Sequence, residues 1–256
     1  MHFNAPSGLL ARRILKDPMH LRMKLVFSAF LGAAAFGLAF LPAGAASPAP
    51  QNDLKSVLER LNVAAANFHS TSADVEFDTI ETEPIPDTDV QKGVVYYDRK
   101  DNAVRMGVHM SEHNGKPSGK AYTFIGGTFR LFEAGANQVT TYTKAGKWES
   151  YVVMGVGASG RDLEAKWDIQ YLGPETLNGV KTEKLELVAK DPEVHKKLSK
   201  ITIWLDPDHA VSLKQVFLLS STSTYVAHYS NFKFNQSLPA DAFTFKTNRQ
   251  TVYSTQ

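Results

Sequence analysis

The chain contains no cysteine. Disulfides are therefore excluded, and the stability of the protein must come from an ordinary hydrophobic core. The part of the chain after residue 45 has about 210 residues, which is enough to bury such a core and suits a single domain.

A basic excess is missing as well. The chain has 28 basic and 26 acidic residues, of which residues 1–45 hold five and one, so 23 and 25 remain after residue 45. A nearly neutral chain has neither the basic footprint of a nucleic-acid-binding protein nor a polybasic cluster for an anionic membrane surface. We therefore expect no nucleic-acid partner.

Recognisable catalytic and metal-binding patterns are scarce. The sequence has no G-x-S-x-G nucleophile elbow. The histidines after residue 45 form no H-x-x-x-H pair on a predicted helix; they are His69, His109, His113, His195, His209 and His228. The segment DPDHA, 206–210, looks like a ligand set, but proline and aspartate here favour a hairpin turn. We expect a protein that is not an enzyme and that has no metal and no cofactor.

A secretory signal is present at the N-terminus. An uncharged run, residues 25–41, follows Arg22 and Lys24 and precedes the small-residue element Ala43-Gly44-Ala45. This order is typical of a cleaved signal peptide, with the cut after Ala45. The run is at the short limit for crossing ~30 Å of hydrocarbon, so a retained membrane anchor is the weaker interpretation.

The signal peptide sets the expected domain boundaries and compartment. Residues 1–45 are the signal, with Met19 or Met23 as a more ordinary start, 46–51 are a linker, and 52–256 form one domain. We expect a periplasmic protein. Because cysteine is absent, the chain has no acceptor for lipid attachment at a bacterial lipoprotein signal.

The domain begins with a helix and continues with strands. Apolar residues from Leu54 to Phe68 fall at helical spacing, with Asn52 or Asp53 available as N-cap. From Ala73 the period changes to two, in segments joined by hairpin turns such as IGGT, 125–128. Two short helices interrupt them, RDLEAKW at 161–167 and DPEVHKKLS at 191–199, the second with Asp191 as N-cap and Pro192 at its first position.

Three glycines match a nucleotide-binding pattern without its context. Gly155, Gly157 and Gly160 have the spacing G-x-G-x-x-G. A dinucleotide-binding loop requires repeated strand-helix-strand crossovers, which this order of elements lacks. We expect these glycines to let an apolar segment bend sharply and lie close to neighbouring backbone.

The strands supply many apolar and aromatic residues. These residues either fill an ordinary core or line the concave side of a sheet that curls into an incomplete barrel. The candidate cavity residues are Leu54, Val57, Leu58, Leu61, Phe68, Phe77, Tyr96, Met106, Phe124, Phe129, Leu131, Met154, Leu187, Ile203, Phe217 and Tyr225.

Segments spread over nearly all of the predicted domain follow the pattern of a known family. They extend from LKSVLERLNVAAANFHSTSADVEF through KGVVYYDRKDNAVRM and YTFIGGTFRLFEAGANQVTTY, and from MGVGASGRDLEAKW to SNFKFNQSLPADAFTFK. In these segments the chain resembles the periplasmic outer-membrane lipoprotein carriers, the LolA-like proteins. The resemblance implies a mainly β, α+β fold: a half-open antiparallel β-barrel of about 10–11 strands, covered by the N-terminal helix and short lid helices.

The resemblance also implies a function and a gate. A hydrophobic cavity would accept the acyl chains of lipidated proteins, and the carrier, a monomer, would take cargo from an inner-membrane releasing transporter and pass it to an outer-membrane acceptor. The lid residues would be Val152, Val153, Met154, Gly155, Gly157 and Gly160. Arg99 occupies the place of a family arginine that hydrogen-bonds the lid backbone, although Lys100 stands where the family has proline.

Two other functions fit the same resemblance. A periplasmic sensor or scaffold would use the fold to bind a protein or a lipid without shuttling it. A carrier of a free envelope lipid would need the same cavity as a lipoprotein carrier. The sequence leaves these alternatives open.

Overall fold

The structure is a computed structural model that describes residues 51–100, 103–143 and 155–256. The predicted signal peptide, and the lid residues Val152, Val153 and Met154, lie outside the described residues. Helix α2 spans Gln51–Ala66, so Asn52 and Asp53 lie in its first turn and not at the N-cap.

The remaining elements are mostly strands. The strands are β1 (Ser70–Glu81), β2 (Asp87–Lys100), β3 (Ala103–His113), β4 (Lys116–Pro117), β5 (Lys120–Ile125), β6 (Thr128–Glu133), β7 (Gln138–Tyr142), β8 (Trp167–Leu177), β9 (Val180–Ala189), β10 (Lys200–Asp206), β11 (Val211–Leu218), β12 (Ser223–Phe234) and β13 (Val252–Thr255). The helices after α2 are the short 3-10 helix η1 (Ala134–Ala136), α4 (Gly160–Lys166) and α5 (Pro192–Lys197).

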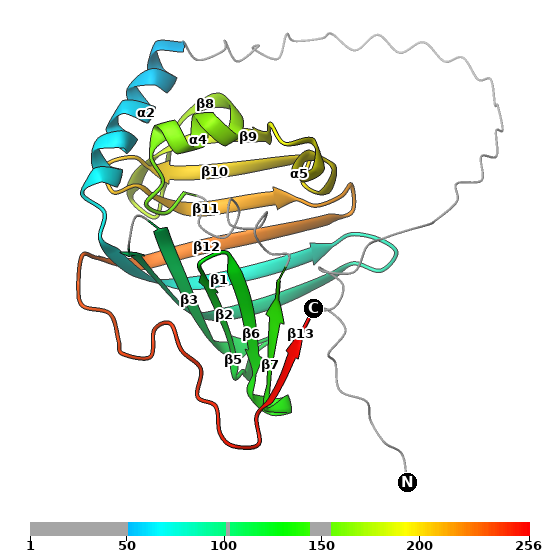
Figure 1. Cartoon of the computed structure of the whole chain (residues 1–256). Helices are drawn as coiled ribbons and strands as arrows, with labels where there is room; N and C mark the ends of the chain where they lie inside the picture. The colour runs from blue at the N-terminus through cyan, green and yellow to red at the C-terminus, as the bar shows by residue number, and fades with distance from the viewer. Residues whose placement is uncertain (1–50, 101–102, 144–154) are drawn as a thin grey trace, which may run out of the picture. The chain divides into compact units, whose positions relative to one another are not determined.

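All thirteen described strands belong to one open sheet. Its order is β13-β7-β6-β5-β3-β2-β1-β12-β11-β10-β9-β8, with β4 beside β3. Every pair is antiparallel except β13 with β7, which is parallel. Figure 1 shows that β3, β5, β6 and β7 run steeply across the direction of β10, β11 and β12. The predicted half-open antiparallel sheet with few helices is confirmed.

The structure describes thirteen strands, more than the about 10–11 expected, and three of them have a weak strand signal in the sequence. The long strand β8 begins with alternating Trp167, Ile169 and Tyr171, but Gly173 and Pro174 then interrupt the strand signal. The other two, β4 and β13, have only two and four residues, too few to show a period.

The short helices begin at side-chain caps. Ser159 caps α4 and forms a capping box with Asp162. The cap therefore lies two residues before Arg161, the predicted first residue of this helix. Asp191 accepts from the backbone N–H groups of Glu193 and Val194 and caps α5, as predicted.

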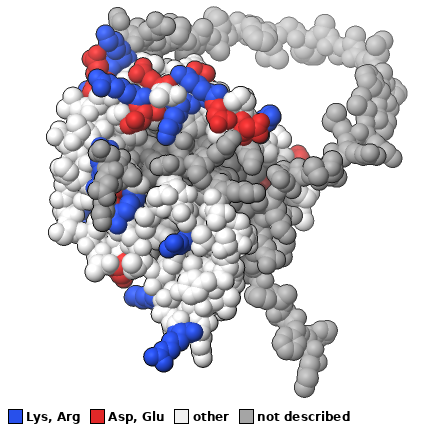
Figure 2. Space-filling view, in the orientation of Figure 1, with Lys and Arg blue, Asp and Glu red and all other residues white. Residues whose placement is uncertain are grey.

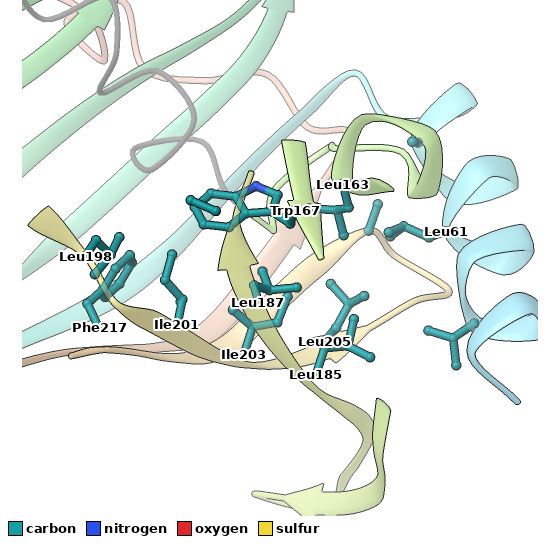
Figure 3. Packing of buried hydrophobic residues seen from close by; sticks show 14 residues of the cluster. Leu61, Leu163, Trp167, Leu185, Leu187, Leu198, Ile201, Ile203, Leu205 and Phe217 are labelled. Carbon is teal, nitrogen blue, oxygen red and sulfur yellow. The ribbon is translucent and has the colours of Figure 1, made fainter. Parts of the chain in front are cut away.

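One hydrophobic cluster joins the helices to the sheet. Leu61 of α2 and Leu163 of α4 point toward Leu185, Leu187 and other side chains of β8–β11 (Figure 3). The apolar stripe predicted for the first helix therefore packs on the sheet. We call the sheet face that meets α2 and α4 the inner face.

A second cluster continues along the inner face. It contains Val75, Val95, Val108 and Phe124, which come from β1, β2, β3 and β5. On the opposite face, the segment after β12 covers β3, where Ala242 is fully buried and lies against Gly107. A Cβ atom at Gly107 would lie 1.8 Å from the Ala242 carbonyl oxygen, so this close approach requires glycine.

Candidate functional site

The inner face is continuous across the sheet because the strand register places apolar residues directly opposite one another. One row runs through Leu187, Ile201, Phe217 and Tyr225 to Thr79. Residues that lie opposite each other on neighbouring strands share a face of the sheet. The row therefore joins the part covered by helices to the part formed by β1 and β2.

Most predicted cavity residues lie on this face or on the helix that covers it. Buried members are Val57, Leu58, Leu61, Phe68, Met106, Phe124, Leu131, Leu187, Ile203 and Phe217, and half-buried members are Leu54, Phe77, Phe129 and Tyr225. Met154 lies outside the described residues. Whether these residues contact a ligand stays a prediction.

Tyr96 lies on the other face, so its prediction is corrected. Tyr96 is paired with Gly107 and has its ring 5.5 Å from that of His109, whereas Val95 and Tyr97 belong to the inner cluster. Two adjacent tyrosines make the strand pattern ambiguous, and a shift of one residue moves a side chain to the opposite face. Of these two tyrosines, Tyr97 is the one on the inner face, and it is one of several inner-face residues, with Val75, Val95 and Val108, that were not predicted.

Six aromatic rings, all half-buried except the buried ring of Phe217, lie across the middle of the inner face. We call them the aromatic strip, and its members are Phe217, Tyr225, Phe77, Tyr122, Phe129 and Tyr142. Ring centroids are 5.6 Å apart for Phe217 and Tyr225, and 5.5 Å apart for Tyr225 and Phe77. On the other side, Phe129 lies 6.0 Å from Tyr122 and 5.8 Å from Tyr142. Such rings offer a large apolar surface that is partly accessible.

The phenols on this face stay neutral over a wide pH range. Burial raises the pKa of Tyr97 and Tyr225 well above the ordinary value and raises the pKa of Tyr229 to about 12. The pKa of Tyr122 is raised as well, first by burial and then by Glu133 and Asp89. The inner face therefore combines apolar rings with uncharged hydroxyl groups.

Residues 155–160, which we call the glycine segment, lie against the end of the inner face near α2. Val156 forms an antiparallel bridge with Val211, the N–H of Gly157 donates to Ala210 O at 2.7 Å, and the N–H of Ser212 donates to Gly155 O at 2.6 Å. Gly155 and Gly157 have positive φ, 70° and 65°.

Each of the three glycines is required by close contact. A Cβ atom would lie 2.1 Å from Ser212 Oγ at position 155, 2.7 Å from the Phe68 ring at position 157, and 2.5 Å from Leu58 O at position 160. The prediction was a sharp bend and close approach to neighbouring backbone. The nearest atom is a backbone oxygen only at Gly160, whereas at Gly155 and Gly157 it belongs to a side chain.

Arg99 joins three separate parts of the chain. Its Nη1 donates to Ala65 O of α2 at 3.1 Å, and its Nη2 donates to Gly157 O of the glycine segment. The Cζ atom lies 5.9 Å from the centroid of the Phe68 ring. Nε is buried and has no hydrogen-bond partner among the described residues, so the two carbonyl oxygens take the hydrogen bonds of this guanidinium.

Described residues line two cavities. A cavity of about 300 Å³ lies beside the arginine contact and includes Phe68, Asn67, His209 and Phe234 in its lining. A larger cavity of about 670 Å³ has a mixed lining that includes Asp74, Glu76, Lys92, Lys214 and His228. Of the predicted cavity residues that the structure describes, Phe68 lines the smaller of these two cavities and none lines the larger.

The segment 206–210 is a hairpin turn, as predicted. Asp206 accepts from the N–H of Asp208 at 3.0 Å and lies 2.7 Å from His209 Nδ1, while Arg60 donates to both carboxylate oxygens of Asp208. In the part of the chain that the structure describes, no group of three or more acidic, histidine or cysteine side chains could hold a metal ion.

Charged residues are unevenly spread over the visible surface. Figure 2 shows lysine, arginine, aspartate and glutamate gathered over the end formed by α2, α4 and α5, with few over the end formed by β5, β6 and β7. Within the described ranges, no helix has the length and apolar character needed to cross a membrane.

Comparisons with known proteins show a likeness of fold. No family model matches the chain. A curated relative, an uncharacterised protein of Methanocaldococcus jannaschii, is 27% identical over 121 residues, which are 47% of this chain. The chain spans only about a third of that protein's length, since the match covers 33% of it.

Several solved structures resemble this one at low sequence identity. An uncharacterised conserved protein from Thermus thermophilus has a TM-score of 0.50 and 12% identity over 80% of this chain and 99% of that chain. MucB has a TM-score of 0.49 and 13% identity over 79% and 66%. A LolA superfamily protein from Nitrosomonas europaea has a TM-score of 0.38 and 18% identity over 75% and 97%. The chain thus has the fold of the Thermus protein, and a LolA superfamily protein is among the structures that resemble it.

Proposed function

We propose that this protein is a periplasmic carrier that binds the acyl chains of lipidated proteins on its inner face and moves them toward the outer membrane. The observation that carries the proposal is the aromatic strip: six rings, five of them only half-buried, on one continuous face of a sheet that is not closed. The sequence resemblance to LolA-like proteins supports the same function.

The chemistry of carriage is physical. Each CH₂ group removed from water contributes about 0.8 kcal/mol, so two or three acyl chains oppose entry into water by more than about 10 kcal/mol. A carrier must offset most of that cost and still release its cargo. Packed side chains that can separate meet both needs, because they cover the apolar face until a ligand replaces them.

Arg99 would hold the empty carrier closed. It bonds the glycine segment to α2 across the end of the inner face, through Gly157 O and Ala65 O. Opening would break the bond to Gly157 and would lift Val156 away from Val211. The arginine contact is therefore the proposed gate.

A matched pair of variants tests the proposal. Phe129 and Arg130 are neighbours on β6, but Phe129 belongs to the aromatic strip and Arg130 is exposed. We expect native mass spectrometry of the protein purified from a periplasmic fraction to detect bound lipoprotein or acyl lipid. The Phe129→Glu variant should lose it and Arg130→Glu should keep it, with both variants folded by circular dichroism.

The outcomes separate the candidate functions. Bound lipoprotein supports the proposed carrier, and bound free lipid alone would replace lipoprotein by a free envelope lipid as cargo. A protein that carries no lipid and does not release lipoproteins from spheroplasts would overturn the proposal and favour a sensor or scaffold.

A further inference from the structure

A chain of hydrogen bonds ends on the aromatic strip. The Tyr122 hydroxyl donates to Gln91 Oε1 at 3.1 Å, and Gln91 Nε2 donates to Asp89 Oδ2 at 3.2 Å. Asn114 Nδ2 also donates to Asp89, at 3.0 Å to Oδ1, and His113 Nε2 contacts the same oxygen. Asp89 is only 7% exposed, so the chain runs from a buried carboxylate to a ring on the inner face.

Asp89 determines which group donates and which accepts in each of these hydrogen bonds. An ionised carboxylate can only accept hydrogen bonds, so Gln91 must turn its amide N–H₂ toward Asp89. Its carbonyl oxygen then faces Tyr122, and the tyrosine must donate its single proton to it. The reversed orientation would place the Gln91 carbonyl oxygen against the carboxylate, which gives no hydrogen bond.

The direction of the chain determines what Tyr122 can offer to a ligand. Since the Tyr122 proton is used in the bond to Gln91, the remaining hydrogen-bonding capacity of Oη is that of an acceptor. A ligand group that reaches this oxygen must therefore donate. Ester and ether oxygens cannot donate, whereas hydroxyl and amide N–H groups can.

We propose that the inner face selects acyl ligands whose polar end carries a hydrogen-bond donor, a hydroxyl or an amide N–H, and that Tyr122 Oη accepts from it. This inference rests on the proposed function and specifies the ligand for the same site. The burial that raises the pKa of Tyr122 favours its neutral form, so it keeps the proton that bonds Gln91.

Strand β2, which carries Gln91, is long enough for an acyl chain to lie along it. Gln91 and Arg99 lie on the same strand, eight residues apart, or about 26 Å at the usual rise of ~3.3 Å per residue. One leaflet of a bilayer spans roughly 15 Å, half of its hydrocarbon core. The apolar residues between these two positions include Val95 and Tyr97, which are buried. An acyl chain would lie along them only after the side chains packed on them have separated.

Two lipids, one with a free hydroxyl group and the other its methyl ether, test this inference. The probes are dioctanoylglycerol, which has a free hydroxyl, and the same lipid with that hydroxyl methylated, each measured by isothermal titration calorimetry. We expect the protein to bind the free hydroxyl form roughly fivefold more tightly, the effect of one net hydrogen bond. Tyr122→Phe should bind both lipids equally, and Tyr225→Phe, which alters another phenol of the strip, should keep the preference.

A second variant tests the direction of the chain. In Asp89→Asn the new amide can donate, which allows Gln91 to turn around and Tyr122 to donate to a ligand instead. The preference for the free hydroxyl should then disappear although Tyr122 is intact, and this result does not depend on whether Tyr122→Phe folds.

The outcomes distinguish this inference from the proposed function. Equal binding of the two lipids by the unaltered protein overturns the inference and leaves the carrier function standing. Binding of neither lipid overturns both. A preference that survives both Tyr122→Phe and Asp89→Asn shows that another group selects the ligand.

Discussion

Replacing Arg99 by methionine should open the glycine segment without unfolding the domain. Methionine keeps much of the aliphatic stem but cannot donate to Ala65 O or Gly157 O. Of these two bonds, only the one to Gly157 O joins Arg99 to the glycine segment. A hydrogen bond from a charged donor contributes about 1.5–3 kcal/mol, so the closed state should lose roughly 10- to 150-fold in population relative to the open state.

Amide hydrogen exchange measures this change directly. The N–H groups of Gly157 and Ser212 donate to Ala210 O and Gly155 O, and both bonds lie where the segment meets the fold. Their exchange rates should rise by the same roughly 10- to 150-fold factor, since exchange follows the open population. Amides of β9, such as that of Leu187, should keep their protection because the core does not open.

Arg105→Met is the matched control. Arg105 lies on β3 of the same hairpin, but it pairs with Asp98 and covers the Phe243 ring at 4.3 Å on the other face. The gate would be refuted by unchanged exchange at Gly157 and Ser212 in Arg99→Met. An equal rise in Arg105→Met would refute it too, because the effect would then belong to the hairpin and not to Arg99.

Three further predictions concern stability. Gly157→Ala should lower the free energy of unfolding by about 1–3 kcal/mol in urea titrations, because φ is +65° and the new Cβ meets the Phe68 ring, whereas Gly126→Ala, at φ +56° in open space, should cost less. Leu187→Ala should cost about 2–5 kcal/mol in the same titration, with Val63→Ser, at a residue 66% exposed, within about 0.5 kcal/mol of the unaltered protein. Burial raises the pKa of Tyr229 to about 12, so the folded state favours the neutral phenol. The stability that the neutral phenol contributes should be fully present below about pH 10, the ordinary tyrosine pKa, and should be lost as pH rises toward about 12. Urea midpoints measured at pH 9 and pH 11.5 would detect this loss. A midpoint that does not fall at the higher pH would contradict this last prediction.

The sequence predicts the order of strands and turns well because each depends on local pattern. The turn at Gly126 and Gly127 and the cap at Asp191 were readable from residue type alone. The face of Tyr96 was not, because adjacent Tyr96 and Tyr97 both suit a strand and only packing selects one of them for the inner face.

The contacts of the candidate site depend on residues far apart in the sequence. The family resemblance predicts that Arg99 bonds the lid backbone. Its partners lie 34 and 58 residues away in the sequence, at Ala65 and Gly157. The hydrogen bond from Tyr122 to Gln91 likewise joins β5 to β2 across 31 residues. No period or motif marks these pairs, because the register of the sheet brings them together.

Both edges of the described sheet have features that limit pairing with another molecule. An unpaired edge strand can recruit another molecule, and repetition of that pairing builds fibres. At one edge β13, only four residues long, pairs with β7 through residues such as Val252 and Gln138. At the other, β8 is irregular between Tyr171 and Gly173, and Pro174 beyond it cannot donate to a neighbouring strand. Loss of β13 would uncover β7, so self-association should begin from that edge.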